Sequence, residues 1–379
     1  MQILLNPSNN TIINRQHINR TNAGLPHRFD NSYIKPTFQA RVSEFIPKDI
    51  PNSILDNVQK TITQYKLFDN KVAHVAYSGG KDSFFLCQAL KSLGYDVRAI
   101  IIDIGYGTKY EAAINNLKKI GLNTLVLSRE MIKSISENST TLLHSNFNKI
   151  KSLSVDKTDT AKKTNICTPC YNSKIVLLTE FAKQNGIKNV AFGHHATDSL
   201  SSMLKSYYMY VDRWKSAHKE FNISNFAELI NSEEKLYKNG EDKGFSKLVE
   251  DISELIDKQK VGTDEPVIRQ IKDSNTVISR PLFRVFENDI IKHFIDTGII
   301  FPQSECFFMG YRTRTVLSPR ELIQYKLLDS CPQEKKELLL DLCEKTLNPD
   351  GTQIFDVRNN RSLILGADYK NSKFNTVKL

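Results

Sequence analysis

Short apolar runs alternate with amphipathic segments along the chain from residue 50 onward. The spacing of apolar positions predicts a helix over 50–66, and beyond it the pattern switches between buried-strand and helical periods. It predicts strands at 72–77, 97–104, 124–127 and 190–192, and helices at 84–93, 109–120 and 173–185. Strands separated by crossovers of a dozen or more residues form parallel sheets that are covered on both faces. We therefore predict a doubly wound, mainly parallel α/β fold, whose ligands bind beyond the carboxyl ends of the strands.

Three regions lack this alternation of strands and helices, and they define the expected domain organisation. Residues 1–48 are Asn-rich, with six basic and two acidic side chains, and form either a basic arm along a phosphate backbone or a loosely ordered extension. Within the expected core domain, 49–310, residues 215–275 hold 10 Lys and Arg against 13 Asp and Glu, which predicts an acidic, solvated helical insertion. Residues 311–379 form an expected helical C-terminal extension.

Net charge, apolar runs and cysteine content limit which kinds of protein this chain can be. The 379 residues carry a net charge of +10; the insertion contributes −3, so the remaining chain is at +13, which suits a polyanionic partner such as RNA. The sequence has no apolar run of about 18 residues and no secretory signal at its start, so we expect no membrane association. Six cysteines are too few for a disulfide scaffold, so we expect a cytoplasmic protein whose thiols serve chemistry or metal binding.

A glycine-rich turn follows the first predicted strand and opens the first predicted helix. It consists of Ser78, Gly79, Gly80, Lys81, Asp82 and Ser83. Two glycines let a backbone approach an anion, and N–H groups at a helix N-terminus bind phosphate. Lys81 adds a positive charge, the two serines add hydroxyl groups, and Asp82 is placed to orient the site or its magnesium. The spacing differs from the Walker A pattern.

Further polar residues lie near the ends of later strands. Asp103 ends the second predicted strand and is either a nucleotide contact or a solvated acid. His194 and Asp198 follow the fourth strand, where they either join the site or serve as a helix cap and a first-turn acid. Arg280 and Arg284 adjoin a short apolar segment, and their guanidinium groups suit a phosphate or RNA backbone if they are not simply exposed loop residues.

The cysteines leave several chemistries open. Cys167 and Cys170 form a C-x-x-C pair just before a predicted helix, which is half of a zinc site, a redox dithiol or part of an iron–sulfur site. The sequence holds no second such pair. We expect Cys87 to lie in a helix core, and Cys331 and Cys343 to be structural.

Together these segments resemble the PP-loop ATP pyrophosphatases, and among them the tRNA 2-thiocytidine synthetase (TtcA) and TilS-like branch. The resemblance spans residues 70–310 and rests on SGGKDS at 78–83, C-x-x-C at 167–170, GHH-x-x-D at 193–198, RPL-x-x-V-x-E-x-D-I at 280–290 and Cys306. It departs from the family's usual pattern at Met309, where a second late cysteine is common, and at Thr197, where a second acid is usual.

The resemblance implies chemistry and ligands. It implies ATP and Mg²⁺ at the loop with Asp103, His194 and Asp198, catalytic roles for Lys81, Asp82, Cys167 and Cys170, and a [4Fe–4S] cluster on Cys167, Cys170 and Cys306. The expected reaction is adenylation of a pyrimidine oxygen in tRNA, followed by attack of sulfur from a donor such as a cysteine desulfurase. Two alternatives remain open, as does homodimerisation. One is a small-molecule acceptor, with persulfide or zinc at the cysteines; the other is a binding protein that has lost turnover.

Overall fold

The computed structural model describes residues 49–105, 110–132, 135–155, 167–215, 223–238, 242–271, 274–297 and 318–357. All of them lie in one unit of the chain, Pro47–Leu379. The predicted N-terminal arm at 1–48 and the candidate cluster ligand Cys306 lie outside the described residues.

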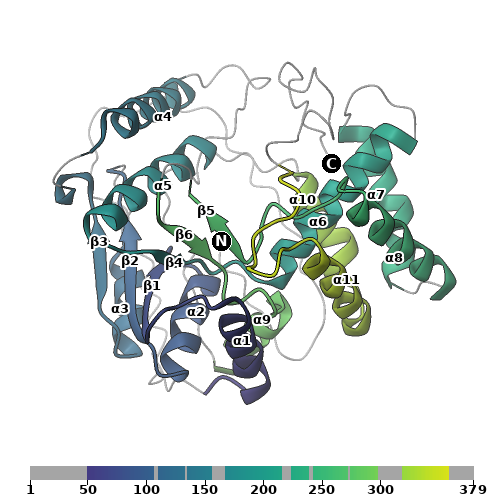
Figure 1. The fold of residues 1–379 in the computed structure, drawn as a ribbon, viewed down its shortest axis with the longest axis horizontal. Coiled ribbons are helices and arrows are strands. Elements are labelled where there is room, and N and C mark those ends of the chain that lie inside the picture. The colour runs from purple at the N-terminus through teal and green to yellow at the C-terminus, as the bar shows by residue number, and fades with distance from the viewer. Residues whose placement is uncertain are drawn as a thin grey trace, which may run out of the picture. The chain divides into compact units, whose positions relative to one another are not determined.

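A six-stranded sheet forms the centre of this unit (Figure 1). Its spatial order is β3-β2-β1-β4-β6-β5, and every pairing is parallel except that of the edge strand β5 with β6. The strands are β1 (Val72–Ala76), β2 (Asp96–Ile102), β3 (Thr124–Leu127), β4 (Asn189–Ala191), β5 (Ile268–Gln270) and β6 (Val277–Ser279). Strand order reverses between β1 and β4, and in such sheets the ligand site lies at the carboxyl ends of the strands around that switch point.

Helices cover both faces of the sheet. The first group is α1 (Asn52–Tyr65), α2 (Lys81–Ser92), α3 (Glu111–Lys119), α4 (Glu137–Val155), α5 (Cys167–Gln184) and α6 (Ala196–Tyr210). Ile100 and Ile102 of β2 share one buried cluster with Leu177 and Leu178 of α5. Because side chains alternate along a strand, Ile101 points to the opposite face, where α2 packs. The predicted α/β architecture is confirmed.

The predicted elements agree with the structure most closely at the strands. The strand at 124–127 is confirmed residue for residue, and those at 72–77, 97–104 and 190–192 lie within two residues of β1, β2 and β4. One helix begins earlier than predicted. The expectation that the C-x-x-C pair precedes its helix is wrong, because α5 begins at Cys167 itself.

The acidic insertion forms two helices, α7 (Ile223–Lys238) and α8 (Asp242–Asp257). They differ from the expected solvated element because each buries an apolar face: Phe226 and Ile230 of α7 and Ile252 of α8 are fully buried. The last part of the predicted insertion also differs, since it contains β5 and belongs to the sheet.

The C-terminal region packs beside the inserted helices. It consists of α9 (Glu287–Thr297), α10 (Pro319–Ile323), the π-helix η5 (Gln324–Leu328) and α11 (Gln333–Lys345). A second π-helix, η3 (Val211–Lys215), precedes the inserted helices. Here η3 extends α6, and η5 continues α10 without a break. Lys335 of α11 reaches the Leu236 carbonyl of α7 and lies over the Phe245 ring of α8 at 4.7 Å. The two late helices α10 and α11 are thereby fixed against α6, α7 and α8.

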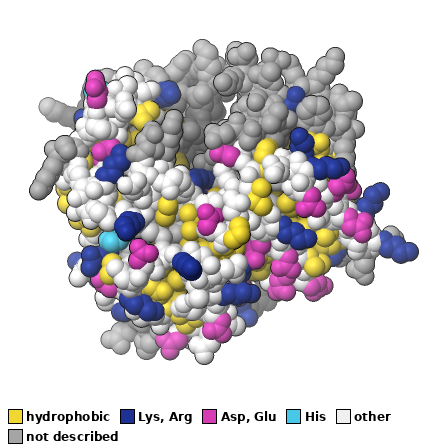
Figure 2. All heavy atoms as spheres, viewed as in Figure 1, with side chains coloured by type: hydrophobic (Ala, Val, Ile, Leu, Met, Phe, Trp, Pro, Cys, Tyr) yellow, Lys and Arg dark blue, Asp and Glu magenta, His cyan; other side chains and the backbone are white. Residues whose placement is uncertain are grey.

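Charged side chains are mixed on the surface drawn in Figure 2. Lys and Arg side chains are interspersed with Asp and Glu over the described part of this face. The positive excess of the sequence therefore does not collect there into a single basic patch. Among the described residues, no helix combines the length and apolar character that a bilayer span requires.

Candidate functional site

The glycine-rich turn forms a compact loop between β1 and α2. Gly79 has φ +82°, a left-handed conformation that favours glycine, and a Cβ there would lie 2.9 Å from that of Ala113. The Ser78 and Ser83 hydroxyl oxygens lie 3.1 Å apart, and the Gly80 N–H donates to that of Ser78. The helix begins at Lys81, so its first N–H groups face the loop, which is the geometry of an anion site.

The GHHATD turn packs directly on this loop. A Cβ on Gly193 would lie 2.7 Å from the Ser83 backbone nitrogen and 2.8 Å from the Asp82 carbonyl carbon. Only glycine permits that approach, because both neighbouring atoms are backbone. The contact brings the start of α6, with its two histidines, against the start of α2.

Lys81 is held between two carboxylates at the centre of the site. Its Nζ lies 2.6 Å from Asp82 Oδ1 and 2.7 Å from Oε1 of Glu287, the first residue of α9. Burial alone lowers the pKa of Lys81, but the two carboxylates outweigh it and raise that pKa above its ordinary value. The lysine is therefore a fixed positive charge beside the loop.

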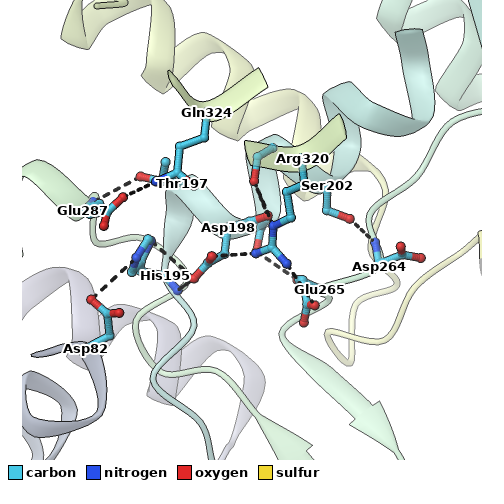
Figure 3. Close-up of polar contacts among 12 residues, drawn as sticks. Asp82, His195, Thr197, Asp198, Ser202, Asp264, Glu265, Glu287, Arg320 and Gln324 are labelled. Carbon is cyan, nitrogen blue, oxygen red and sulfur yellow. Dashed lines mark hydrogen bonds and ion pairs between the residues drawn. The ribbon is translucent and has the colours of Figure 1, made fainter. Parts of the chain in front are cut away.

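His195 links this cluster to Asp198. Its Nε2 lies 3.7 Å from Asp82 Oδ1, and its Nδ1 lies 3.5 Å from Asp198 Oδ2 (Figure 3). The same Asp198 oxygen accepts the His195 backbone N–H at 3.0 Å. Each of the two ring nitrogens of His195 therefore faces a carboxylate oxygen.

Asp198 is strongly held in its ionised form. Arg320 of α10 donates to its other oxygen, Oδ1, at 2.5 Å. Burial works to raise the pKa of Asp198, but the neighbouring His195 and Arg320 outweigh it and lower the pKa to about 2. His194, by contrast, stacks on Phe192, and burial lowers its pKa, so its ring is neutral at pH 7.

Three of these side chains form a candidate cation site. Asp82, His195 and Glu287 each offer one ligand atom, and those atoms lie within 4.8 Å of one another. Two carboxylate oxygens and an imidazole nitrogen suit a divalent cation, and a carboxylate behind the imidazole, here Asp198, is the usual partner of a metal-bound histidine.

Arg280 and Arg284 are placed differently from the expectation. Arg280 is fully buried and pairs with the Glu265 carboxylate, while its Nη1 donates to the Pro266 carbonyl at 2.6 Å. Arg284 is 6% exposed and joins α1 to α11 through Gln64 and Glu344. The expectation that these guanidinium groups face a phosphate or RNA backbone is corrected, because both are committed to partners inside the protein.

The remaining predicted residues lie at or near the same edge of the sheet. Asp103 follows β2, and its Oδ1 accepts the Gly105 N–H at 2.9 Å. Cys170 is half-buried in the first turn of α5, whereas the described side chains do not include that of Cys167. Because α5 leads into β4 and runs antiparallel to it, this first turn lies at the carboxyl edge where the glycine-rich loop lies.

Four site residues had no role assigned from the sequence: Glu265, Glu287, Arg320 and Gln324. Glu287 belongs to the RPL-x-x-V-x-E stretch, which follows β6, and it is the first residue of α9. An acidic residue at a helix start that follows a strand is a signal from which it could have been found. Arg320 had only the capping signal Ser318-x-x-Glu321, which predicts a helix start and not a contact with Asp198.

Comparisons with known proteins point to one group of enzymes. A family model described as queuosine biosynthesis protein QueC matches residues 72–202. The chain is 29% identical to a tRNA-5-methyluridine(54) 2-sulfurtransferase of Thermotoga maritima over 154 residues, covering 40% of this chain and 46% of the relative. It is 26% identical to a tRNA-cytidine(32) 2-sulfurtransferase of Geobacter metallireducens, covering 42% of this chain and 58% of the relative. The similarity thus spans about half the length of these relatives.

A solved structure is also similar. It is the U34-tRNA thiolase NcsA from Methanococcus maripaludis with its [4Fe–4S] cluster, at a TM-score of 0.43 and 15% identity over 77% of each chain. The sequence similarities confirm the resemblance to the PP-loop enzymes and to their tRNA 2-thiolating members, the tRNA-cytidine sulfurtransferases included.

Proposed function

We propose that this chain is an ATP-dependent sulfurtransferase that thiolates a nucleobase of tRNA. The observation that carries the proposal is the meeting of the SGGKDS loop and the GHHATD turn around Lys81, at the sheet edge where the C-x-x-C turn of α5 also lies. An anion site, a candidate cation site and a thiol pair are the parts that adenylation followed by sulfur transfer requires.

The chain's own residues would perform the ATP step as follows. The α2 N-terminus and the Lys81 ammonium bind the pyrophosphate that departs when a pyrimidine oxygen attacks the α-phosphorus. Asp82, His195 and Glu287 would hold Mg²⁺, which would supply positive charge to the leaving group. A sulfur nucleophile then attacks the adenylated carbon and expels AMP. A base in a stack is out of reach, so the target is an unstacked loop nucleotide.

The sulfur step is assigned to the cysteines. Cys167 and Cys170 are three residues apart in the first turn of α5, which is a spacing that two ligands of one cluster can have. With Cys306 as third ligand they would hold a [4Fe–4S] cluster, which would supply iron to bind the transferred sulfur. The donor of that sulfur is a partner such as a cysteine desulfurase.

The decisive measurement is nucleoside mass spectrometry of tRNA from cells with and without this gene. We expect one thio-nucleoside to be missing without the gene and restored by the wild-type chain. Lys81→Ala should fail to restore it while keeping its iron, because the ammonium binds phosphate and not the cluster. The matched control is Lys188→Ala, whose side chain is 80% exposed and 3.9 Å from Asp69; it should restore the modification fully. Identical tRNA nucleosides in both strains would refute the proposal.

The cluster has its own test. Cys306→Ala should lose iron on anaerobic purification, although it is far from Cys167 in sequence, whereas Cys87→Ala should retain it because Cys87 is a fully buried core residue. A colourless, zinc-containing wild-type protein with unchanged tRNA would instead favour a small-molecule acceptor.

A further inference from the structure

Helix α10 and the π-helix η5 bring two side chains into the site from beyond the matched residues 72–202. Arg320 and Gln324 are four residues apart, so they lie on one helical face. The apolar residues between and after them, Leu322, Ile323, Leu327 and Leu328, are buried. The π-helix begins at Gln324 itself, and such turns are frequent at functional positions.

Arg320 holds three groups with one guanidinium. It donates to Asp198 Oδ1 at 2.5 Å and to the Ser201 hydroxyl at 3.2 Å, and its Nη1 lies 3.5 Å from Glu265 Oε1 (Figure 3). The second Asp198 oxygen is the one that contacts His195. Fixing Asp198 therefore fixes the orientation of the histidine whose Nε2 faces Asp82.

Gln324 acts on the other side of the cluster. Its amide donates to Glu287 Oε2, while Glu287 Oε1 contacts Lys81 at 2.7 Å. The Glu287 backbone N–H donates to the Thr197 hydroxyl at 3.1 Å. The carboxylate plane of Glu287 is thus set by a residue of the C-terminal region before any ligand enters.

We propose that Arg320 and Gln324 are positioning residues of the nucleotide site, Arg320 acting through Asp198 on His195 and Gln324 acting through Glu287 on Lys81. The proposal rests on the proposed function for the identity of the nucleotide. According to the proposal, α10 and η5 orient residues of the site in addition to packing against the neighbouring helices. The consequence is a loss of transition-state stabilisation in the folded protein when either side chain is shortened.

The test compares full-length Arg320→Ala, Arg320→Lys and Gln324→Leu with the control Lys326→Ala. Lys326 lies on the same π-helix, is 41% exposed and points toward Glu234 of α7. ATP–pyrophosphate exchange with tRNA gives kcat and KM, calorimetry gives the affinity for Mg·ATP, and thermal unfolding reports the fold.

Removing groups that orient ligands typically costs about 10–100-fold in activity or metal affinity, and we expect that loss in kcat/KM for Arg320→Ala and Gln324→Leu. It should fall mainly on kcat, with the melting temperature of Gln324→Leu close to that of the wild type. Arg320→Ala also loses the ion pairs with Asp198 and Glu265, so its activity is measured well below its own melting temperature. Arg320→Lys should recover part of the loss, because an ammonium still pairs with Asp198 but cannot also reach Ser201 and Glu265. Lys326→Ala should behave as the wild type.

Wild-type kcat and KM in folded Arg320→Ala and Gln324→Leu would overturn the proposal. So would a loss of activity that follows the melting temperature alone, with Arg320→Lys no better than Arg320→Ala. If the wild-type protein binds Mg·ATP but gives no exchange with tRNA, the proposed function fails. In that case, weaker Mg·ATP binding by Arg320→Ala and Gln324→Leu supports their role in positioning the site, and unchanged binding overturns it.

Discussion

Replacing Arg280 with methionine tests whether this arginine is a structural or a substrate-binding residue. The change keeps an unbranched side chain in a fully buried position but removes the ion pair to Glu265 and the hydrogen bond to the Pro266 carbonyl. It leaves the Glu265 carboxylate, 8% exposed, with two more distant cations: Arg320 at 3.5 Å and Arg269 at 3.8 Å.

The expected magnitude follows from that environment. Removing one partner of a buried ion pair costs about 3–5 kcal/mol, and the two remaining arginines place Arg280→Met near the lower end, at about 3 kcal/mol. For a chain of this size about 2 °C of melting temperature is lost per kcal/mol, so we expect a decrease of about 6 °C. Arg98→Met is the matched control. Its pair with Asp96 is more than half exposed and is worth about 1 kcal/mol or less.

Thermal unfolding of the two variants and the wild type, together with their affinity for tRNA, completes the assay. A structural Arg280 lowers the melting temperature of Arg280→Met and leaves tRNA affinity unchanged at temperatures where the variant is folded. Equal melting temperatures for Arg280→Met and Arg98→Met, with weakened tRNA binding only in Arg280→Met, would refute the reasoning and restore the substrate role.

Two further predictions concern Gly193, which contacts the glycine-rich loop, and Asp198. Gly193→Ala should reduce ATP-dependent turnover about 100-fold, because its Cβ would displace the backbone of Asp82 and Ser83 by about 1 Å; unchanged ATP–pyrophosphate exchange would contradict this contact. Asp198, with its pKa lowered to about 2, contributes stability that is present above the unfolded-state pKa of about 3.9 and is lost as the pH falls toward 2. Asp198→Asn should therefore be about 2 kcal/mol less stable at pH 7, a difference that shrinks toward pH 2; a gap in melting temperature that is independent of pH would exclude this cause.

The elements that the sequence predicted well are those whose signal is local. The loop at 78–83 combines a preceding apolar strand, two glycines and a first-turn acid, and each of these acts within a few residues. Short strands carry less signal. The strands β5 and β6 have three residues each, which is too short to show the alternation of buried and exposed positions. The sequence assigned β5 to the acidic insertion because charged residues continue beyond Asp257, where α8 ends.

The site residues that the sequence did not yield depend on contacts across long separations. Arg280 and Glu265 are 15 residues apart, and Arg320 is 122 residues from Asp198. An arginine beside an apolar segment has the same appearance in sequence whether it faces solvent or a buried carboxylate. Only the pairing of β5 with β6 decides the question for Arg280, because it places Pro266 and Glu265 next to the start of the RPL segment.

The charged groups of the site form one alternating series from the core to the loop. It runs from Arg280 through Glu265, Arg320, Asp198 and His195 to Asp82, and Lys81 and Glu287 close it beside the glycine-rich turn. Glu265, Asp198 and Asp82 each contact a cation or a histidine on both sides, and Glu287 contacts Lys81 on one side and the Gln324 amide on the other, so each carboxylate is fixed in two directions. Arg320 is supplied by α10, and α10 packs against α6 and the inserted helix α7. The two regions outside the resemblance therefore contribute to the orientation of the acids beside the glycine-rich loop. The insertion and the C-terminal extension are thus, in physical terms, the outer support of the same site.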